Sequence, residues 1–353
     1  MKGNLYLDQF IGSLRARGLP QTLRQAWSRL VSEDTAPVPL GERLWLNRHG
    51  FKPDSYFVYG FDAIHRTARN AFMSDGANAR LGQRNRRFGA ALRNKLLFHR
   101  VMRLQHGIRA PDLVGFIDDA RVLQAAAPHR PVALTDLFHD DDELVFKPVT
   151  GSKSSGVLRM HRDAASLDLL QRHRSAHGYI AVRVVRQASY AAAVHAPSTN
   201  TIRIVTMRDP DTNEVFVPRA VHRFGVKATG QVDNWAAGGV SCNVDVTDGT
   251  LGAGVIHPRF TAWRLDWLER HPDSDSQLLG ACVPQWGELL ATVGELMNLF
   301  PDVTFAAWDM LATDEGWCAI EGNEIMGIHL IQVHGGLFED PRVARFVAFH
   351  TGE

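Results

Sequence analysis

The sequence WDMLATDEGWCAIEGN, residues 308–323, carries the richest set of potential metal ligands in the chain. Its apolar and aromatic residues predict two strands joined by a turn at Thr313–Gly316. Glu321 and Asn323 are two apart, so their side chains leave the same face of a strand, and a hairpin can bring Asp309 onto that face. Two carboxylates and one amide oxygen form the hard-oxygen set that Mg²⁺ prefers. The alternative is an edge hairpin whose acidic side chains face solvent.

A second candidate for ligand binding is VFKPVTGSKSSGVLRM, residues 145–160. Lys147 lies in a predicted apolar strand, where a buried ammonium group needs an anionic partner. The small residues that follow allow close backbone approach, and their N–H and hydroxyl groups can donate to phosphate oxygens. The alternative is an ordinary flexible hairpin of Gly and Ser. The predicted phosphate loop consists of Thr150, Gly151, Ser152, Lys153, Ser154, Ser155 and Gly156.

Two further segments place polar residues beside predicted strands or turns. In STNTIRIVTMRD, Asn200 stands near the start of a predicted strand and Arg203 lies within it. Since isoleucines flank Arg203, its guanidinium leaves the opposite face, toward either solvent or a site. In VDNWAAGGVSCNVD, Asp233 and Asn234 precede a Gly-Gly pair that predicts a tight loop with available N–H groups, or a plain β-bulge.

The bulk composition excludes several classes of protein. The chain has 353 residues, a formal net charge of +1 and 45% hydrophobic residues, so global charge argues for neither nucleic acid nor membrane as a partner. Three scattered cysteines are too few for a disulfide framework. The N-terminus has no long apolar segment and no stretch is long enough to span a bilayer, so we expect a cytoplasmic protein. Oligomerisation stays open.

The order of predicted elements favours an α+β fold. Helical patterns dominate the first hundred residues, including two short helices within residues 5–31 and one at Arg93–His106. Strand-like segments follow, and Val215–Arg223 is expected to pair with the Arg203 strand across a turn. We predict three units: a helix-rich N-terminal region at residues 1–90, a first subdomain with the phosphate loop at 91–195, and a second subdomain with the metal site at 196–353.

Taken in order, these motifs resemble the ATP-grasp superfamily, most closely its sugar-transfer-associated branch, which is related to alpha-L-glutamate ligases. The resemblance spans about residues 90–330 and implies an ATP-grasp fold, in which two α+β subdomains grip ATP between antiparallel sheets. The residues that carry it are Asn94-Lys95, Phe146-Lys147-Pro148 with the loop after it, Ser198–Arg203, Asp233-Asn234 with Gly238-Gly239, Trp308-Asp309 and Ile320–Asn323.

The resemblance also implies roles for individual residues. Lys95 and Lys147 would contact the phosphates of ATP, and Arg203 would meet the γ-phosphate or an acyl phosphate. Mg²⁺, with Mn²⁺ as a substitute, would be held by Asp309, Glu321 and Asn323. The catalytic set would be Arg203, Lys147 and Asn323, and the nucleotide set would be Lys95, Lys147, the loop Thr150–Gly156, Val182, Arg183, Asn200, Arg203, Asp233 and Asn234.

One segment departs from the pattern of that family. ATP-grasp proteins usually place an acidic residue in the strand that links the subdomains, near the adenine and ribose. Here this strand reads YIAVRVVRQ, with Val182 and Arg183 and no acidic residue. The contact to the ribose must then come from elsewhere, or the affinity for the nucleotide is weak.

Three functions are compatible with these motifs. The first is an ADP-forming ligase that activates a small-molecule carboxylate as an acyl phosphate and couples it to an amine, as in the biosynthesis of a small molecule. The absence of any Ser/His/Asp arrangement agrees with it, because the two substrates react with each other. The second is a kinase of a hydroxyl substrate, with His65, His222 or Asp233 as the base. The third is a nucleotide-binding protein without catalysis.

Overall fold

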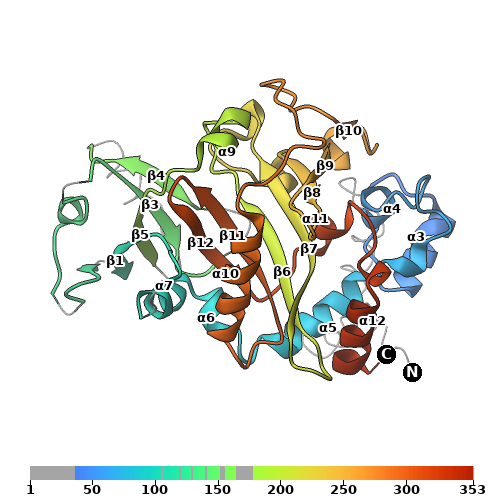
Figure 1. The fold of residues 1–353 in the computed structure, drawn as a ribbon, viewed down its shortest axis with the longest axis horizontal. Coiled ribbons are helices and arrows are strands. Elements are labelled where there is room, and N and C mark those ends of the chain that lie inside the picture. The colour runs from blue at the N-terminus through green and yellow to red at the C-terminus, as the bar shows by residue number, and fades with distance from the viewer. Residues whose placement is uncertain are drawn as a thin grey trace, which may run out of the picture.

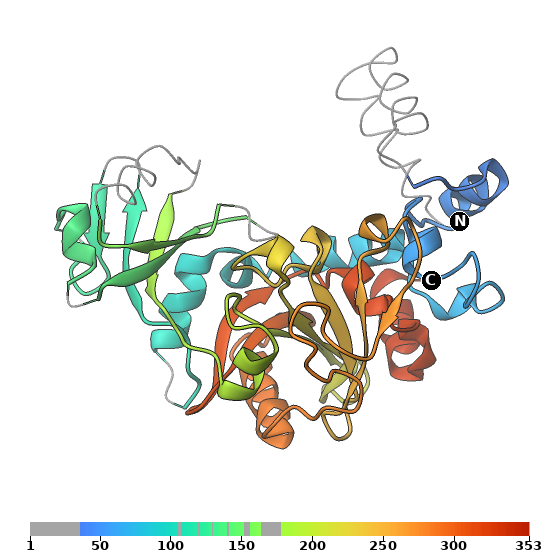
Figure 2. The ribbon, with the colours of Figure 1, turned by 90° about the horizontal axis from the view of Figure 1, so that it is seen from above.

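The computed structural model describes residues 36–104, 107–118, 121–128, 130–139, 141–151, 156–163 and 178–352. Two antiparallel sheets lie side by side, and the N-terminal helices lie at the far end of the larger sheet (Figures 1 and 2). The helices predicted within residues 5–31 and the loop residues Ser152, Lys153, Ser154 and Ser155 fall outside the described residues. Within the described parts of the chain, no helix is long and apolar enough to cross a bilayer.

The smaller sheet has five strands in the order β2-β1-β5-β3-β4. On β3, Leu144 and Phe146 enter one apolar cluster, while Val145 packs against a second cluster on the opposite face. Lys147 continues the row of Val145, so the pleat turns it toward the larger sheet. The strands are β1 (Leu113–Asp118), β2 (Arg121–Gln124), β3 (Glu143–Pro148), β4 (Leu158–His161) and β5 (Tyr179–Arg183).

The larger sheet has seven strands in the order β10-β9-β8-β7-β6-β11-β12. All the strand pairs in both sheets are antiparallel. The strands are β6 (Ile202–Arg208), β7 (Val215–Phe224), β8 (Val240–Val244), β9 (Leu251–Ile256), β10 (Trp267–Leu268), β11 (Phe305–Thr313) and β12 (Gly316–Asn323).

Helices cover both faces of the larger sheet, which is why every residue of β11 is buried. One face packs against α10 (Trp286–Asn298). The other packs against α5 (Asp75–Asn85), α11 (Ile328–Gln332) and α12 (Pro341–Thr351), and Figure 1 shows α12 beside α5. The other helices are α3 (Leu40–Arg48), α4 (Ser55–Val58), α6 (Ala90–Arg93), α7 (Lys95–Arg103) and α9 (Ser189–Val194). Short 3₁₀ helices are η1 (Arg69–Ala71), η2 (Leu134–Leu137), η3 (Lys227–Thr229), η4 (Trp235–Ala237), η5 (Pro258–Phe260) and η6 (Leu337–Glu339).

The α+β class and the main strand pairings are confirmed. The predicted hairpin is β11–β12, with its turn between Thr313 and Gly316, and β6 pairs with β7 as expected. The helix predicted at Arg93–His106 is α7, which begins one residue after Asn94, because the Asn94 side chain accepts from Leu97 N at 3.1 Å and caps it.

A β-bulge in the β11–β12 pair was not predicted. Asp309 lies opposite Glu321, but Met310 lies opposite Ala319, so Ile320 is the extra residue of β12. A bulge bends its strand and changes the direction of the side chains around it. As a result, both Ile320 and Glu321 line the same cavity, although they are sequence neighbours.

Asn85 ties the end of α5 to the strands that carry the acidic side chains. Its side chain is buried, with 2% exposure. Nδ2 donates to the carbonyls of Phe305 at 2.9 Å and Glu324 at 3.2 Å, and Oδ1 accepts from Thr304 N at 3.3 Å. These bonds satisfy backbone groups that water cannot reach.

We predict that Asn85→Ala lowers the free energy of unfolding by about 1–3 kcal/mol, because it leaves buried backbone groups unpaired. Urea denaturation followed by circular dichroism measures the change. Gln83→Ala, at an exposed position of the same helix, is the control and should stay within about 0.5 kcal/mol of wild type. Equal effects of the two substitutions would contradict the role given to Asn85.

Candidate functional site

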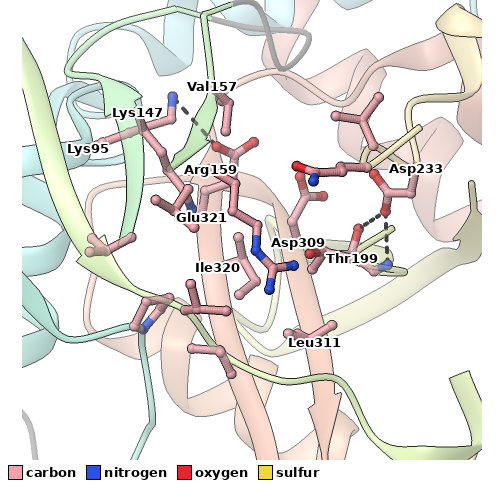
Figure 3. Close-up of a pocket in the computed structure, with 18 of the residues that line it drawn as sticks. Lys95, Lys147, Val157, Arg159, Thr199, Asp233, Asp309, Leu311, Ile320 and Glu321 are labelled. Atoms are coloured by element: carbon pink, nitrogen blue, oxygen red, sulfur yellow. Dashed lines mark hydrogen bonds and ion pairs between the residues drawn. The ribbon is translucent and has the colours of Figure 1, made fainter. Parts of the chain in front are cut away.

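A cavity lies between the two sheets and collects charged side chains from both (Figure 3). Its described lining holds five basic residues and three acidic ones, so its formal charge is positive. The end of β5 and the residues after it contribute the apolar side chains Val182, Val184 and Val185, which line the cavity together with Leu311 and Ile320. The basic residues are Lys95, Lys147, Arg159, Arg183 and Arg223, and the acidic ones are Asp233, Asp309 and Glu321.

Asp309 is the central carboxylate of this site. It lies on β11 directly opposite Arg203 of β6, and the two side chains form a bidentate ion pair, with Nη2 at 2.8 Å from Oδ2 and Nε on Oδ1. Arg223 of β7 approaches the same carboxylate, with Nη2 at 3.2 Å from Oδ2. Burial opposes ionisation, but the two guanidinium groups outweigh it and hold the pKa of Asp309 well below its usual range.

The other two predicted metal ligands lie on β12. Glu321 faces Asp309 across the strand pair, and its Oε2 lies 3.5 Å from Lys95 Nζ. Asn323 follows two residues later and does not line the cavity; its Nδ2 donates to the carbonyl of Ala307 at 3.2 Å, which leaves Oδ1 as the acceptor atom. Among the described residues, no three His, Cys, Asp or Glu side chains form a metal site on their own. Carboxylate and amide oxygens are the donor types that suit Mg²⁺, which completes its shell with phosphate and water, but of the three residues only Asp309 and Glu321 line the cavity.

Lys147 is the least compensated charge of the site. It is 8% exposed, and none of the described residues places an oxygen within hydrogen-bonding distance of its Nζ. Burial lowers the pKa of Lys147, and the charge of Glu321 only partly opposes this effect. Lys95, in contrast, donates to the carbonyl of Gly151 at 3.1 Å and pairs with Glu321. A buried ammonium without a partner is a site for an anionic ligand.

The sequence of the chain identifies its family. The profile of the family described as sugar-transfer-associated ATP-grasp matches residues 80–345. The chain belongs to this family. None of the curated proteins matches it.

Several solved ATP-grasp structures are similar to the chain at low identity. The ADP complex of purK, an N5-carboxyaminoimidazole ribonucleotide synthetase, is 12% identical, with a TM-score of 0.40 over 67% of this chain and 45% of that one. An L-amino acid ligase from Bacillus licheniformis is 14% identical, with a TM-score of 0.38 over 68% and 42%. The ATP-grasp ligase PsnB with a minimal precursor is 11% identical, with a TM-score of 0.38 over 74% and 62%. The chain therefore spans less than two thirds of each of these proteins.

The structure separates the other ATP-grasp residues predicted from sequence into two groups. Gly151, Val182 and Arg183 line the cavity together with Asp233, whereas Thr150 and Gly156 are described but do not line it. Arg183 also pairs with Asp141, at 3.4 Å.

The two asparagines lie outside the lining and bond to the backbone. Asn200 is buried, and its Nδ2 donates to the carbonyls of Ala191 at 3.0 Å and His195 at 2.7 Å. Asn234 caps η4 by accepting from Ala236 N at 3.0 Å. Both side chains therefore bond to the backbone near the cavity and do not line it.

Of the three candidate bases for a kinase reaction, only Asp233 lines the cavity. Its Oδ2 accepts from Thr201 N at 2.9 Å and Thr201 Oγ1 at 2.5 Å, and burial raises its pKa. His222 is buried on the opposite face of the sheet, where burial lowers its pKa to about 3. His65 binds the carbonyl of Tyr59 in the N-terminal region.

Sequence reasoning missed Arg223, Arg159 and Thr201 as lining residues of the ATP-grasp site. Arg223 lies in the strand that was expected to pair with the Arg203 strand, and the alternation of β7 puts it on the same face as Val221, opposite Arg203. That pairing was the signal that could have revealed Arg223. Arg159 offered no comparable signal, because its strand is short and its side chain also pairs with Glu143.

We predict that Lys147→Met raises the free energy of unfolding of the ligand-free protein, on the order of 1 kcal/mol, because it removes a buried charge that no described residue pairs with. The sign of the pH dependence follows. The pKa of Lys147 in the folded protein lies below its ordinary value of 10.5. Between these two pKa values the unfolded state binds more protons than the folded state. The loss of folding stability caused by Lys147 therefore becomes smaller as the pH rises through that window.

Urea denaturation at neutral and at alkaline pH measures both effects. The gain from Lys147→Met should shrink toward pH 10, and Lys227→Met, at an exposed position, should change little at either pH. If Lys147→Met destabilised the ligand-free protein as much as a core truncation does, Lys147 would have a structural partner and the ligand role would fail.

Proposed function

We propose that this protein is an ATP- and Mg²⁺-dependent ligase that joins a small-molecule carboxylate to an amine and releases ADP and phosphate. The observation that carries the proposal is that Lys147, buried in a positively charged cavity between two sheets, has no hydrogen-bond partner among the described residues. A buried ammonium group such as that of Lys147 favours the binding of a polyanion. Because the chain belongs to the ATP-grasp family, we infer that this polyanion is ATP. The identity of both substrates is open to experiment.

The proposed reaction has two steps that balance without a protein nucleophile. A carboxylate oxygen attacks the γ-phosphorus of ATP, and ADP leaves, which gives an acyl phosphate. The amine nitrogen then attacks the carbonyl carbon, phosphate leaves, and the amine loses a proton to form the amide. Phosphoryl transfer of this type needs positioning and charge neutralisation more than covalent help.

Lys95 and Lys147 are proposed to hold the phosphates, and the loop Thr150–Gly156 to close over them. Lys147 supplies charge directly, while Lys95 is positioned by Gly151 and Glu321 on either side of its ammonium group. The apolar side chains Val182, Val184 and Val185, with Leu311 and Ile320, suit a purine ring.

Asp309, Glu321 and Asn323 are proposed to hold Mg²⁺, or Mn²⁺ in its place. When bound there, the metal neutralises phosphate charge and orients the phosphate oxygens. Asp309 brings a carboxylate already ionised by its guanidinium neighbours, and Glu321 is exchanged between Lys95 and the ligand.

A kinase of a hydroxyl substrate is the second candidate, because Asp233 offers a carboxylate inside the cavity whose pKa burial raises. The raised pKa brings the carboxyl group of Asp233 closer to neutral pH, where a general base is most effective. The two reactions differ in product: a kinase releases no free phosphate and needs one acceptor, whereas a ligase releases phosphate and needs two substrates. A protein that only binds nucleotide turns over neither.

The decisive experiment is a screen of carboxylate and amine pairs for ATP-dependent phosphate release. We expect release only when both substrates are present, and a loss of at least about 100-fold in Asp309→Asn, Glu321→Gln and Lys147→Ala, as for removal of a preorganised electrostatic group. Glu315→Gln, in the exposed turn of the same hairpin, with 79% of its side chain exposed, is the matched control and should keep full activity. Formation of ADP with one hydroxyl acceptor, with the phosphoryl group transferred to that acceptor and no free phosphate released, would favour the kinase instead.

A further inference from the structure

Two arginines share the carboxylate of Asp309, but their environments differ. Arg203 uses Nε and Nη2 for both oxygens of Asp309. Its third nitrogen, Nη1, lies beside the chain after β12, since a Cβ placed on Gly327 would lie 3.2 Å from it. Arg203 is not among the residues that line the cavity. The two arginines are equally exposed, at 11%, so the difference between them is that Arg223 lines the cavity and Arg203 does not.

Arg223 lines the cavity and keeps one nitrogen available. Nη2 lies 3.2 Å from Asp309 Oδ2 and donates to Thr201 Oγ1, while Nε lies 3.4 Å from Asp233 Oδ2. Within the described parts of the chain, no group pairs with Nη1. The side chain is 11% exposed, and that exposure opens onto the cavity that Asp309 and Asp233 also line.

These contacts hold the guanidinium of Arg223 in a fixed orientation before any ligand arrives. The hydroxyl of Thr201 accepts from Nη2, the carboxylate of Asp309 lies beside the same nitrogen, and Asp233 lies 3.4 Å from Nε, which forms no hydrogen bond among the described residues. A planar cation held in this way loses little conformational entropy when it binds an oxyanion. Preorganised donors of this kind stabilise charge that develops during a reaction.

We propose that Arg223 is the catalytic arginine of this site, whose Nη1 contacts the phosphoryl group while it is transferred, and that Arg203 is a positioning residue that holds Asp309. The inference rests on the proposed ATP-dependent function and changes the role that the sequence assigned to Arg203. The guanidinium of Arg223, which lines the cavity, neutralises charge on the oxygens of the transferred phosphoryl group. Arg203 acts on the reaction only through the carboxylate that it orients.

The test compares the binding of two probes, ADP alone and ADP with aluminium fluoride, a mimic of the phosphoryl group in transfer. Both are measured by calorimetry with Mg²⁺ present. We expect the wild-type protein to bind the fluoride complex at least tenfold more tightly than ADP. Arg223→Met should abolish most of that preference and change the affinity for ADP by less than about threefold. Arg203→Met should weaken both probes together, because Asp309 loses its orientation.

Arg219→Met is the matched control. Arg219 lies on the same strand and the same face as Arg223, is nearly as buried at 15% exposure, and donates to Asn243 Oδ1 at 3.2 Å away from the cavity. It should keep the wild-type preference for the fluoride complex. Arg223→Lys is the second variant if Arg223→Met does not fold, and it should lose the preference partially.

The outcomes separate the two proposals. A wild-type protein that binds neither probe overturns the nucleotide-dependent function and this inference with it. A wild-type preference that survives in Arg223→Met, or that disappears selectively in Arg203→Met, overturns only the assignment of Arg223. Where turnover is measurable, millimolar guanidinium should restore part of the phosphate release of Arg223→Ala and none of that of Arg203→Ala, because only the first leaves its gap in the cavity wall.

Discussion

The buried carboxylate of Asp309 is the constraint on which the site depends. An ionised carboxylate inside a sheet is stable only with partners that replace its hydration, and here they are guanidinium groups from the two strands next along, β6 and β7. The antiparallel register sets this contact, because it places Arg203 directly opposite Asp309 and brings Arg223 onto the same face. A shift of one residue in either pairing would turn a charged side chain into the apolar layer under α10. The ion pairs of the site therefore form only when the strands of the larger sheet pair in this register.

The charges of the cavity are balanced unevenly, and the imbalance is informative. Arg203 and Arg223 are compensated by Asp309 and Asp233, and Lys95 by Glu321. Lys147 is left over, buried on a strand that offers it no oxygen among the described residues. A folded protein tolerates such a charge at a cost in stability, and function is the usual reason for keeping it. Lys147, the uncompensated lysine, lies on the smaller sheet, whereas Asp309 and Glu321 lie on the larger one. A polyanion bound together with its metal would therefore contact both sheets.

Much of the fold could be predicted from the sequence, because its signals are local. The turn after Thr313 and the helix predicted at Arg93–His106 each depend on residues close in sequence, and both are confirmed. The bulge at Ile320 could not be predicted, since it depends on how β12 packs against its neighbours rather than on its own composition. Arg223 was missed for a related reason: its role comes from a strand pairing across the sheet, and no motif marks it. Asn200 lies inside the motif that carries the resemblance, but its side chain bonds to backbone carbonyls outside the cavity lining, which the motif alone does not reveal.

The N-terminal helical region, which resembles the family least, is nevertheless linked to the site through α11. His329 lies between the carboxylates of Asp75 at 3.3 Å and Asp54 at 3.5 Å; burial disfavours its charged form, but the acids outweigh this and raise its pKa. Gln332 binds both backbone groups of Met73, at 2.8 and 2.9 Å. Because α11 starts directly after Gly327, whose left-handed backbone lies beside Arg203, these contacts fix the segment next to that arginine. The helical region is thus coupled to Arg203, and through Arg203 to the orientation of Asp309, without contributing a side chain to the described lining of the cavity.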